Sequence, residues 1–336
     1  MSRNSKYSQS VCRYQQGVAL IYVLLIFSMM SLMASQMVTT LLLHTEKNAR
    51  FIERIQARHY ALGAEQYVAY LLEEDFVEDK KKKRFVDHEN ERWNIRKVDY
   101  DVDQGSIDLV VVDEQGRFNI NWLTSEGKTG EKFMSIFKNL LQNQDINVEL
   151  ADWIQTWLGA APDAAKGEAA DNIYLMLDPP RRAANTEIAS VSEIKLVEGM
   201  TSEYFERLAP LVSALPKTSK INVNTALPEV IRSISDKITE DDAEAIIEGR
   251  GLDGFAKIDE LSNVTEVIDK MADLKSAKLV FSSQYFSTYI KATYRDTSFY
   301  MKTLLFRNNE GQVQIAGREI GPNSYWLTDK KAPEAN

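Results

Sequence analysis

Few side chains in this sequence are of the types that act as nucleophiles or transition-metal ligands. The chain has one cysteine, Cys12, and three histidines, His44, His59 and His88, which stand far apart. Because a zinc-type site needs several nitrogen or sulfur ligands close together, this pattern does not predict one. The sequence also contains no G-x-S-x-G, H-E-x-x-H or P-loop motif. We therefore expect a protein without enzymatic activity.

Residues 220–226 (KINVNTA) open a stretch that could bind phosphate. The stretch is similar to the helix-hairpin-helix pattern of some DNA-binding proteins, in which backbone N–H groups of a glycine-containing turn hold the phosphate. The similarity extends to Ala243, Ile246, Ile247, Arg250, Gly254, Phe255 and Leu261. However, the turn at residues 235–238 (SDKI) has no glycine, and residues 219–270 contain six basic and twelve acidic side chains. Because phosphate binding depends on cations, we expect this hairpin to pack and not to bind nucleic acid.

A long apolar segment near the N-terminus must position everything that follows. Residues 18–33 carry no charge, and the apolar character continues to residue 43. A helix needs about 20 apolar residues to cross a bilayer, and no proline interrupts this one. Arg3, Lys6 and Arg13 precede it without any acidic residue. Since positive flanks stay in the cytoplasm, we predict a transmembrane helix over residues 18–43 with the bulk of the chain on the far side.

The fate of this segment depends on where the chain is cut. A cleaved secretory signal has an apolar region of about 7–15 residues and then a small-x-small site. Here the run is longer, and residues 33–35 (MAS) form a poor site. Residues 15–17 (QQG) resemble the type III signal of pilins and pseudopilins, whose leader is removed on the cytoplasmic side while the apolar helix is kept. The resemblance implies that a prepilin peptidase cuts between Gly17 and Val18 and removes Cys12 with the leader 1–17.

Tyr22 departs from the pilin pattern. Most pilins have glutamate at the fifth mature position, where the carboxylate pairs with the N-terminal amine of the subunit above. A carboxylate inside a membrane needs such a partner. A tyrosine at this position implies either a subunit with nothing above it, at a filament tip, or a chain that does not assemble.

The order of the remaining patterns predicts an α+β fold. Residues 44–78 continue the helix, with Phe51 and Ile55 at helical spacing among small residues. Residues 85–124 and 279–327 alternate like strands, while 125–278 have helical periods and include the hairpin at 219–270. A sheet of only two strands is at best marginally stable alone in water. We therefore expect one antiparallel sheet against the long helix, as in pilins, with a large all-α inserted domain.

Several local contacts can also be predicted. The charge run 79–84 (DKKKKR) indicates a solvated loop, and the polar tail 328–336 indicates disorder. Asn119 and Asn121 should lie on one face of an extended segment and satisfy backbone groups near a domain junction. Asn222 and Asn224, together with Thr225, should cap the helix that follows them. Thr201 should cap a helix beginning at residue 202.

Four motifs together resemble the general secretion pathway K pseudopilins of type II secretion. They are HYALGAE at 59–65, GRFNINWL at 116–123, DWI at 152–154 and KINVNTA at 220–226. The resemblance spans most of the mature chain. It implies a minor pseudopilin in the bacterial inner membrane, with a cytoplasmic N-terminus, a methylated mature N-terminus and a periplasmic body. It further implies that the protein caps the pseudopilus tip and helps to initiate assembly for the export of folded proteins.

The same resemblance implies a set of partners. They are the minor pseudopilins I, J and H, the major pseudopilin G, the prepilin peptidase and the inner-membrane assembly platform, with no nucleic acid. Val18, Tyr22, Phe51 and Ile55 would belong to the helix that assembles with them. After removal of the leader the exported part would contain no thiol, and therefore no disulfide.

The resemblance also implies a calcium site in the helical domain. Calcium takes about six to eight oxygen ligands, several of them carboxylates. Asp152, Glu168 and Asp171 would supply carboxylates, and Asn172 a carbonyl oxygen. Residues 155–157 (QTW) then stand where family members are richer in acids. The alternative is an acidic loop in which Asp152 caps a helix or pairs with an arginine.

Three other functions remain open from the sequence. A minor pilin of a type IV pilus would be expected to have the same membrane helix and body, and would differ only in its partners. A membrane-anchored helix-hairpin-helix protein would bind DNA, although the chain's net charge of −9 is unfavourable for binding a polyanion such as DNA. An anchored periplasmic enzyme would need a pocket of converging catalytic groups.

Overall fold

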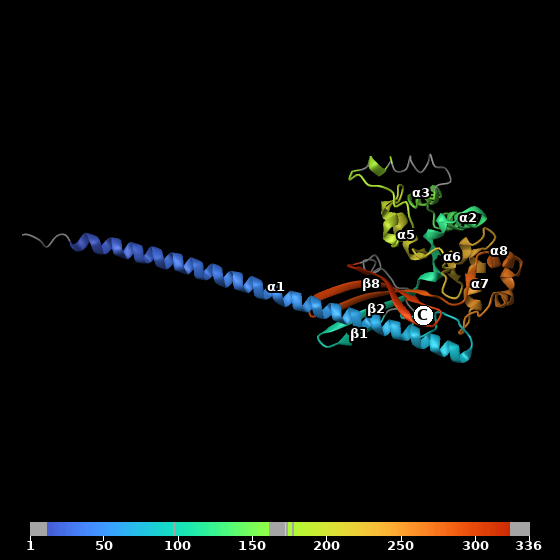
Figure 1. Cartoon of the computed structure of the whole chain (residues 1–336), viewed down its shortest axis with the longest axis horizontal. Coiled ribbons are helices and arrows are strands. Elements are labelled where there is room, and N and C mark those ends of the chain that lie inside the picture. The colour runs from blue at the N-terminus through green and yellow to red at the C-terminus, as the bar shows by residue number, and fades with distance from the viewer. Residues whose placement is uncertain (1–11, 97, 161–171, 173, 177, 323–336) are drawn as a thin grey trace, which may run out of the picture.

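The computed structural model describes residues 12–322, except for residues 97, 161–171, 173 and 177. Its dominant element is α1 (Cys12–Lys82), a single helix of 71 residues. At about 1.5 Å per residue this rod is roughly 105 Å long, and its N-terminal half projects from the body (Figure 1). The described part from Val18 contains an apolar window with a mean hydropathy of 2.3 and no buried residue, so it is long and apolar enough to cross a membrane.

One prediction about the C-terminal end of α1 is wrong. The helix continues to Lys82, so most of the charge run predicted as a loop is helical. Lys80, Lys81 and Lys82 occupy the last turn, where cations interact favourably with the negative end of the helix dipole. Asp79 is buried, and its Oδ2 accepts a hydrogen bond from the Val86 backbone N–H at 2.9 Å.

Five antiparallel strands form one sheet in the order β1-β2-β7-β8-β9. Their bounds are β1 (Val98–Val102), β2 (Gly105–Asp113), β7 (Tyr285–Tyr294), β8 (Thr297–Arg307) and β9 (Val313–Ile320). β2 pairs with β7 along its whole length, so strands from before and after the insertion share one sheet. This confirms the predicted pilin-like α+β fold, although β1 begins later than the alternating pattern from Trp93 suggested.

The sheet packs against the C-terminal half of α1 (Figure 1). Alternate residues of β8, including Phe299, Met301 and Leu305, are buried in this layer, as strand geometry requires. The helix contributes small residues, Ala57 and Ala61, both with no exposed surface. Small side chains let the helix approach the strands closely, which explains why alanines recur at helical spacing here.

The inserted domain is mainly helical. The α-helices among its described residues are α2 (Gly127–Asn143), α3 (Glu149–Trp157), α5 (Ser202–Leu208), α6 (Pro228–Ser233), α7 (Glu240–Gly249) and α8 (Met271–Ser276). Its 3₁₀ helices are η1 (Glu114–Gly116), η2 (Ile120–Thr124), η3 (Val191–Leu196), η4 (Ala209–Leu211), η5 (Ile258–Asn263) and η6 (Thr265–Lys270). Short strands pair in parallel, β3 (Phe118–Asn119) with β4 (Val212–Ser213) and β5 (Ile221–Asn222) with β6 (Leu279–Val280).

Three helix predictions in this domain, for residues 191–197, 202–215 and 258–270, are wrong in type or extent. The segments near residues 191–197 and 258–270 are 3₁₀ and not α-helical. The helix capped by Thr201, whose Oγ1 accepts from the Tyr204 N–H at 3.1 Å as predicted, ends at Leu208 and not at residue 215. Pro210 follows within η4, and a proline there removes a helical hydrogen bond.

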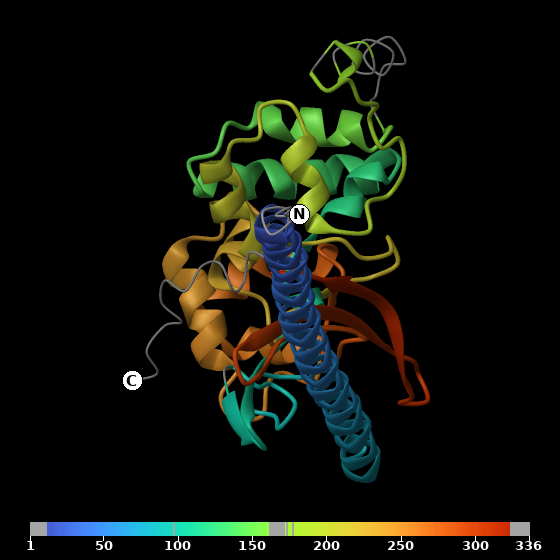
Figure 2. The ribbon, with the colours of Figure 1, turned by 90° about the vertical axis from the view of Figure 1, so that its left-hand side faces the viewer.

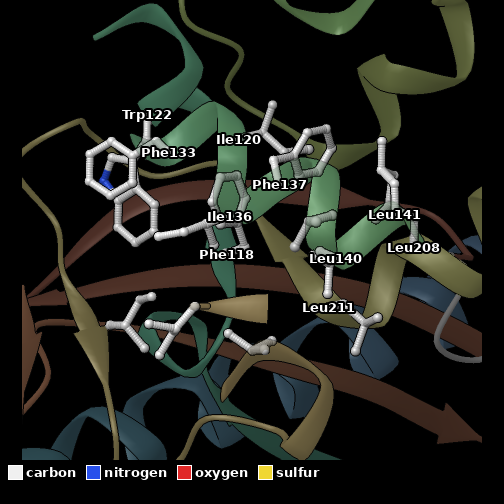
Figure 3. Packing of buried hydrophobic residues seen from close by; sticks show 14 of the residues in the cluster. Phe118, Ile120, Trp122, Phe133, Ile136, Phe137, Leu140, Leu141, Leu208 and Leu211 are labelled. Carbon is white, nitrogen blue, oxygen red and sulfur yellow. The ribbon is translucent and has the colours of Figure 1, made fainter. Parts of the chain in front are cut away.

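The GRFNINWL segment leads the chain into the core of the inserted domain. Figure 3 shows Phe118 and Trp122 packed on α2, with ring centroids 5.1 Å from Phe137 and 4.7 Å from Phe133. The segment is extended only at Phe118–Asn119 and then becomes 3₁₀, so the prediction of one extended face is wrong.

The predicted role of the two asparagines in this segment is nevertheless confirmed. Asn119 Nδ2 donates to the Leu215 carbonyl at 2.9 Å, and Asn121 Nδ2 donates to the Ile188 carbonyl at 3.0 Å. Both side chains are buried, so these bonds satisfy backbone groups that water cannot reach.

Candidate functional site

The side of α1 that points away from the sheet carries apolar side chains without a partner among the described residues. Phe51, Ile52 and Ile55 are 64%, 63% and 40% exposed. At about 3.6 residues per turn Ile52 and Ile55 lie roughly opposite Ala57 and Ala61, which face the sheet, and Phe51 lies to one side. The sequence pattern had placed Phe51, Ile55, Ala57 and Ala61 in one helical apolar pattern, but the helix presents two different faces. The outer face is available for another helix.

The outer face continues in both directions along α1. Toward the C-terminus, Tyr70 and Val77 are 57% and 49% exposed and lie on the same side as Ile55. Toward the N-terminus the helix enters its apolar segment, where Val18 and Tyr22 are exposed. The exposed polar residues His59, Gln66 and Glu73 lie on the same side, so outside the membrane segment the exposed apolar residues form two patches and not one continuous strip. Gly17 and Val18, the predicted cleavage pair, lie within continuous helix near the N-terminal end of α1.

A buried arginine joins three elements at the distal end of the sheet. Arg307, the last residue of β8, is 4% exposed, and its Nη2 lies 2.5 Å from both carboxylate oxygens of Asp87. Its Nη1 donates to Asp75 Oδ2 at 3.1 Å and to the Leu72 carbonyl at 3.2 Å, both on α1. This geometry connects the sheet, α1 and the loop that follows α1.

The KINVNTA motif attaches the inserted domain to this junction. Asp113, the last residue of β2, accepts hydrogen bonds from Asn222 Nδ2 at 3.0 Å and from Thr225 Oγ1 at 2.6 Å. Ser283 Oγ also donates to Asp113 at 2.6 Å, and its backbone N–H donates to Asp87 at 2.6 Å. The predicted capping role is therefore wrong, because α6 begins after Leu227 without a side-chain cap. The motif instead binds a buried carboxylate at the domain boundary.

Carboxylates outnumber cations in this junction. Asp75, Asp87 and Glu91 place carboxylate oxygens within 4.8 Å of one another, and Arg307 donates to two of the three. Burial raises the pKa of Asp75 to about 7, and burial with the nearby charges of Asp75 and Asp87 raises the pKa of Glu91 to about 9. Burial also raises the pKa of Asp113 to about 6, against the effect of its hydrogen bonds. The junction therefore holds protons near neutral pH.

We expect the protein to lose stability as the pH rises from 5 to 9, and a Glu91→Gln variant to lose less. Between pH 4.5 and 9 the folded chain keeps a proton on Glu91 that the unfolded chain releases. One such proton changes the free energy of unfolding by at most about 1.4 kcal/mol per pH unit. Urea unfolding at pH 5, 7 and 9 measures this. Glu89→Gln, at a half-exposed carboxylate in the same loop, is the control, and an unchanged slope for Glu91→Gln would refute the assignment.

The predicted calcium ligands are only partly described. Asp152 in α3 is 62% exposed, and its Oδ1 forms an ion pair with Lys138 Nζ of α2 at 2.9 Å. The alternative had expected an arginine as its partner. Asn172 is exposed, while Glu168 and Asp171 lie outside the described residues. Calcium binding by these four residues stays a prediction.

The hairpin formed by α6 and α7 uses its cations internally. In its turn, Lys237 Nζ lies 3.4 Å from Asp273 Oδ2, and at the far end Lys270 Nζ lies 3.1 Å from Asp242 Oδ1. Arg250 is buried and donates to the Ala226 carbonyl. Arg250 Nη1 also lies 3.7 Å from Glu89 Oε1 in the loop after α1. These contacts support the predicted packing role, in which the hairpin's cations bind acidic and carbonyl groups of the same chain.

Sequence reasoning missed the Arg307 junction. Arg307 and Asp87 are 220 residues apart, and neither lies in a recognisable motif. The one available signal was the polar KINVNTA segment, because buried asparagines in a short strand require partners. That signal predicted a buried polar contact without identifying Asp113 as its acceptor.

Comparisons with known proteins show which family this chain is similar to. Two family models, both described as type II secretion system protein K, match residues 116–217 and 221–282. Type II secretion system protein K of Pseudomonas aeruginosa is 31% identical over 92% of this chain and 94% of its own length. The corresponding protein of Aeromonas hydrophila is 29% identical over 92% of this chain and 98% of its own.

A solved structure has a similar fold. A chain in the crystal structure of the GspK–GspI–GspJ complex from enterotoxigenic Escherichia coli aligns with a TM-score of 0.68. The alignment covers 81% of this chain and 98% of that chain, at 22% sequence identity. At this identity the similarity concerns the fold, and it extends to both the sheet and the inserted domain.

Proposed function

This chain belongs to the type II secretion system protein K family, and from that premise we propose that it is a minor pseudopilin that caps the pseudopilus tip. Its role would be structural and not enzymatic. The family membership separates it from the minor pilins of type IV pili, which the sequence alone left open. The single observation that carries the proposal is the outer face of α1, defined by Phe51, Ile52, Ile55, Tyr70 and Val77.

The outer face supports lateral assembly with other pseudopilin helices. Its apolar side chains are exposed outside the membrane segment, where their burial against a second helix is favourable. A relative of similar fold was solved in a complex with GspI and GspJ. We propose that this chain binds its own I and J pseudopilins through this face, and also contacts the H and G pseudopilins and the inner-membrane assembly platform.

Two features support a position at the tip. Tyr22 stands where a shaft subunit would have the glutamate that pairs with the subunit above. The inserted domain lies beside the distal half of α1 and widens the molecule there (Figures 1 and 2). Another subunit stacked above would overlap this domain. Assembly would then start with this chain, with the shaft growing beneath it.

The apolar half of α1 supports an inner-membrane location. We propose that the prepilin peptidase cuts between Gly17 and Val18, that the new N-terminus is methylated, and that the body lies in the periplasm. The positive residues Arg3, Lys6 and Arg13 agree with a cytoplasmic leader.

Immunogold labelling of sheared pseudopili tests the position at the tip. An epitope inserted at the exposed Leu252 turn should label one end of each filament. The same epitope on the major pseudopilin serves as the control and should label along the shaft. Labelling of this chain along the shaft would refute the capping role.

A further inference from the structure

Four basic side chains form a stripe along α1 between the apolar segment and the body. They are Lys47, Arg50, Arg54 and Arg58, and all four are exposed. Their spacings of three, four and four residues place them on one side of the helix, over about 16 Å of its length. Residues 44–58 carry a net charge of +2, from four basic and two acidic side chains, in a chain whose net charge is −9.

Most of the charge of this basic stripe is not neutralised within the described part of the chain. Arg50 pairs with Glu46 at 2.7 Å, but the two side chains are 74% and 59% exposed, so the pair is weak. The second acidic side chain, Glu53, accepts a hydrogen bond from Thr297 of the sheet at 2.9 Å. The other three members of the stripe form no ion pair or hydrogen bond with any described residue.

The basic stripe borders an exposed apolar patch formed by Phe51, Ile52 and Ile55. By helical geometry Phe51 lies between the stripe and Ile55. Protein interfaces commonly have an apolar centre and a polar rim. In paired helices, charges beside the apolar seam determine which partner binds. The stripe and the patch therefore form one surface that suits a second helix.

The basic stripe lies on the side of α1 nearer β9. Glu65 follows Arg58 by seven residues and therefore lies on the same side of the helix. Its carboxylate pairs with Arg318 of β9 at 2.7 Å. β1 meets α1 from the other side, where the rings of Tyr67 and Tyr100 lie 6.3 Å apart. A partner that binds the stripe must therefore lie along the β9 side of α1.

The length of the stripe distinguishes a protein partner from lipid. At about 1.5 Å per residue, Arg54 and Arg58 lie roughly 16 and 22 Å beyond Leu43, where the apolar segment ends. The polar layer on each side of a bilayer is only about 5–8 Å thick. Half of the stripe therefore lies beyond the reach of lipid headgroups.

We propose that the basic stripe binds an acidic stripe on the helix of a neighbouring pseudopilin, which packs along α1 over Phe51, Ile52 and Ile55. This inference rests on the proposed function and adds the chemistry of the partner. A helix nearly parallel to α1 meets all four cations, because the stripe follows the helix axis. A second copy of this chain packed through the same surface does not fit, because the two basic stripes would repel each other.

Charge reversal in the full chain tests this contact. The fourfold variant replaces each cation of the stripe by glutamate: Lys47→Glu, Arg50→Glu, Arg54→Glu and Arg58→Glu. At low salt its Kd for the I or the J pseudopilin should be roughly 100-fold higher than that of the parent, because attraction becomes repulsion at four positions. Biolayer interferometry with purified I and J in detergent measures Kd, and circular dichroism checks that the variant is folded.

Two controls accompany the fourfold variant. Replacing the exposed Lys80, Lys81, Lys82 and Lys83 by glutamate makes the same change in net charge at the distal end of α1, and should leave Kd close to the parent value. A single reversal within the stripe should raise Kd by about fivefold or less, because exposed ion pairs are individually weak. Arg54→Asp alone therefore still captures both proteins from membranes.

Salt dependence and rescue separate charge recognition from a structural defect. The Kd of the parent should rise by about tenfold or more as NaCl increases from 50 to 500 mM, because salt screens exposed charges. The Kd of the fourfold variant should not rise. Replacing the acidic side chains of the partner's helix by lysine should restore binding to the fourfold variant and weaken binding to the parent.

Each other occupant of this surface has its own outcome. Parent-like binding by the fourfold variant at low salt would overturn this proposal and leave assembly through Ile52 and Ile55 standing. Unchanged binding to I and J, with loss of binding to phosphatidylglycerol vesicles or of self-association, would overturn it in favour of lipid or of a second copy. If the parent bound neither I nor J, this proposal and the proposed function would both be wrong.

Discussion

Replacing Arg307 by methionine should lower the free energy of unfolding by about 3–5 kcal/mol, because it leaves two buried carboxylates without their counter-charge. Arg307 lies within hydrogen-bond distance of Asp87 and Asp75 and of the Leu72 and Ser283 carbonyls, so all these acceptors lose a donor at once. For a body of this size the loss corresponds to roughly 10 °C in Tm. Thermal unfolding followed by circular dichroism measures it in the detergent-solubilised full chain.

Two matched variants separate this effect from simple loss of an arginine. Arg92→Met removes a 72% exposed guanidinium that pairs with Glu74, and should change the stability by less than about 1 kcal/mol. Adding Asp87→Asn to Arg307→Met should recover part of the stability, since the buried charge is then gone. If Arg307→Met unfolds at the parent temperature, the junction does not hold the domains together as we describe.

Replacing Ile52 and Ile55 together by aspartate should abolish capture of the I and J pseudopilins from membranes. Each carboxylate would have to lose water in an apolar helix interface. If each position contributes about 2 kcal/mol, the pair changes Kd by roughly 1,000-fold. Folding should be little affected, because both side chains are exposed and belong to neither buried core cluster. Affinity pull-down followed by mass spectrometry provides the measurement.

Controls for this pair use the same substitution on other sides of α1. Arg54→Asp introduces an aspartate at an exposed position off the outer face and should leave capture intact. Ala57→Asp buries a charge against the sheet and should instead destabilise the body, since Ala57 has no exposed surface. Full capture of I and J by the Ile52→Asp, Ile55→Asp chain would show that the outer face does not mediate assembly.

The architecture could be predicted because its signals are local. Alternation and turn residues predict strands at 284–294, 297–307 and 312–319, each within one residue of β7, β8 and β9. Helical periodicity predicts a helix at 240–249, the observed bounds of α7 (Glu240–Gly249). This helix is fixed by a capping box between Thr239 and Asp242. Other boundaries were set by tertiary packing. The segments η3 and η5 are 3₁₀ helices, a form that is frequent in short connecting pieces.

The junction could not be predicted because its partners meet only in the folded chain. Asp75, Asp87, Asp113 and Arg307 come from α1, a loop and the ends of two strands, and no period in the sequence relates them. The two faces of α1 could not be distinguished from the sequence for a different reason. Phe51, Ile55 and Ala57 all fit a helical apolar pattern, but only the position of the sheet shows which of them are covered.

The N-terminus of the protein in its membrane tests the account most directly. Intact-mass analysis of the chain purified from the inner membrane should give a polypeptide that begins at Val18, and cells without the prepilin peptidase should give the uncut chain. A membrane-embedded chain beginning at Val18 keeps the apolar half of α1 for assembly. A polypeptide that begins beyond Ala34 and is recovered from the soluble periplasmic fraction would contradict the account.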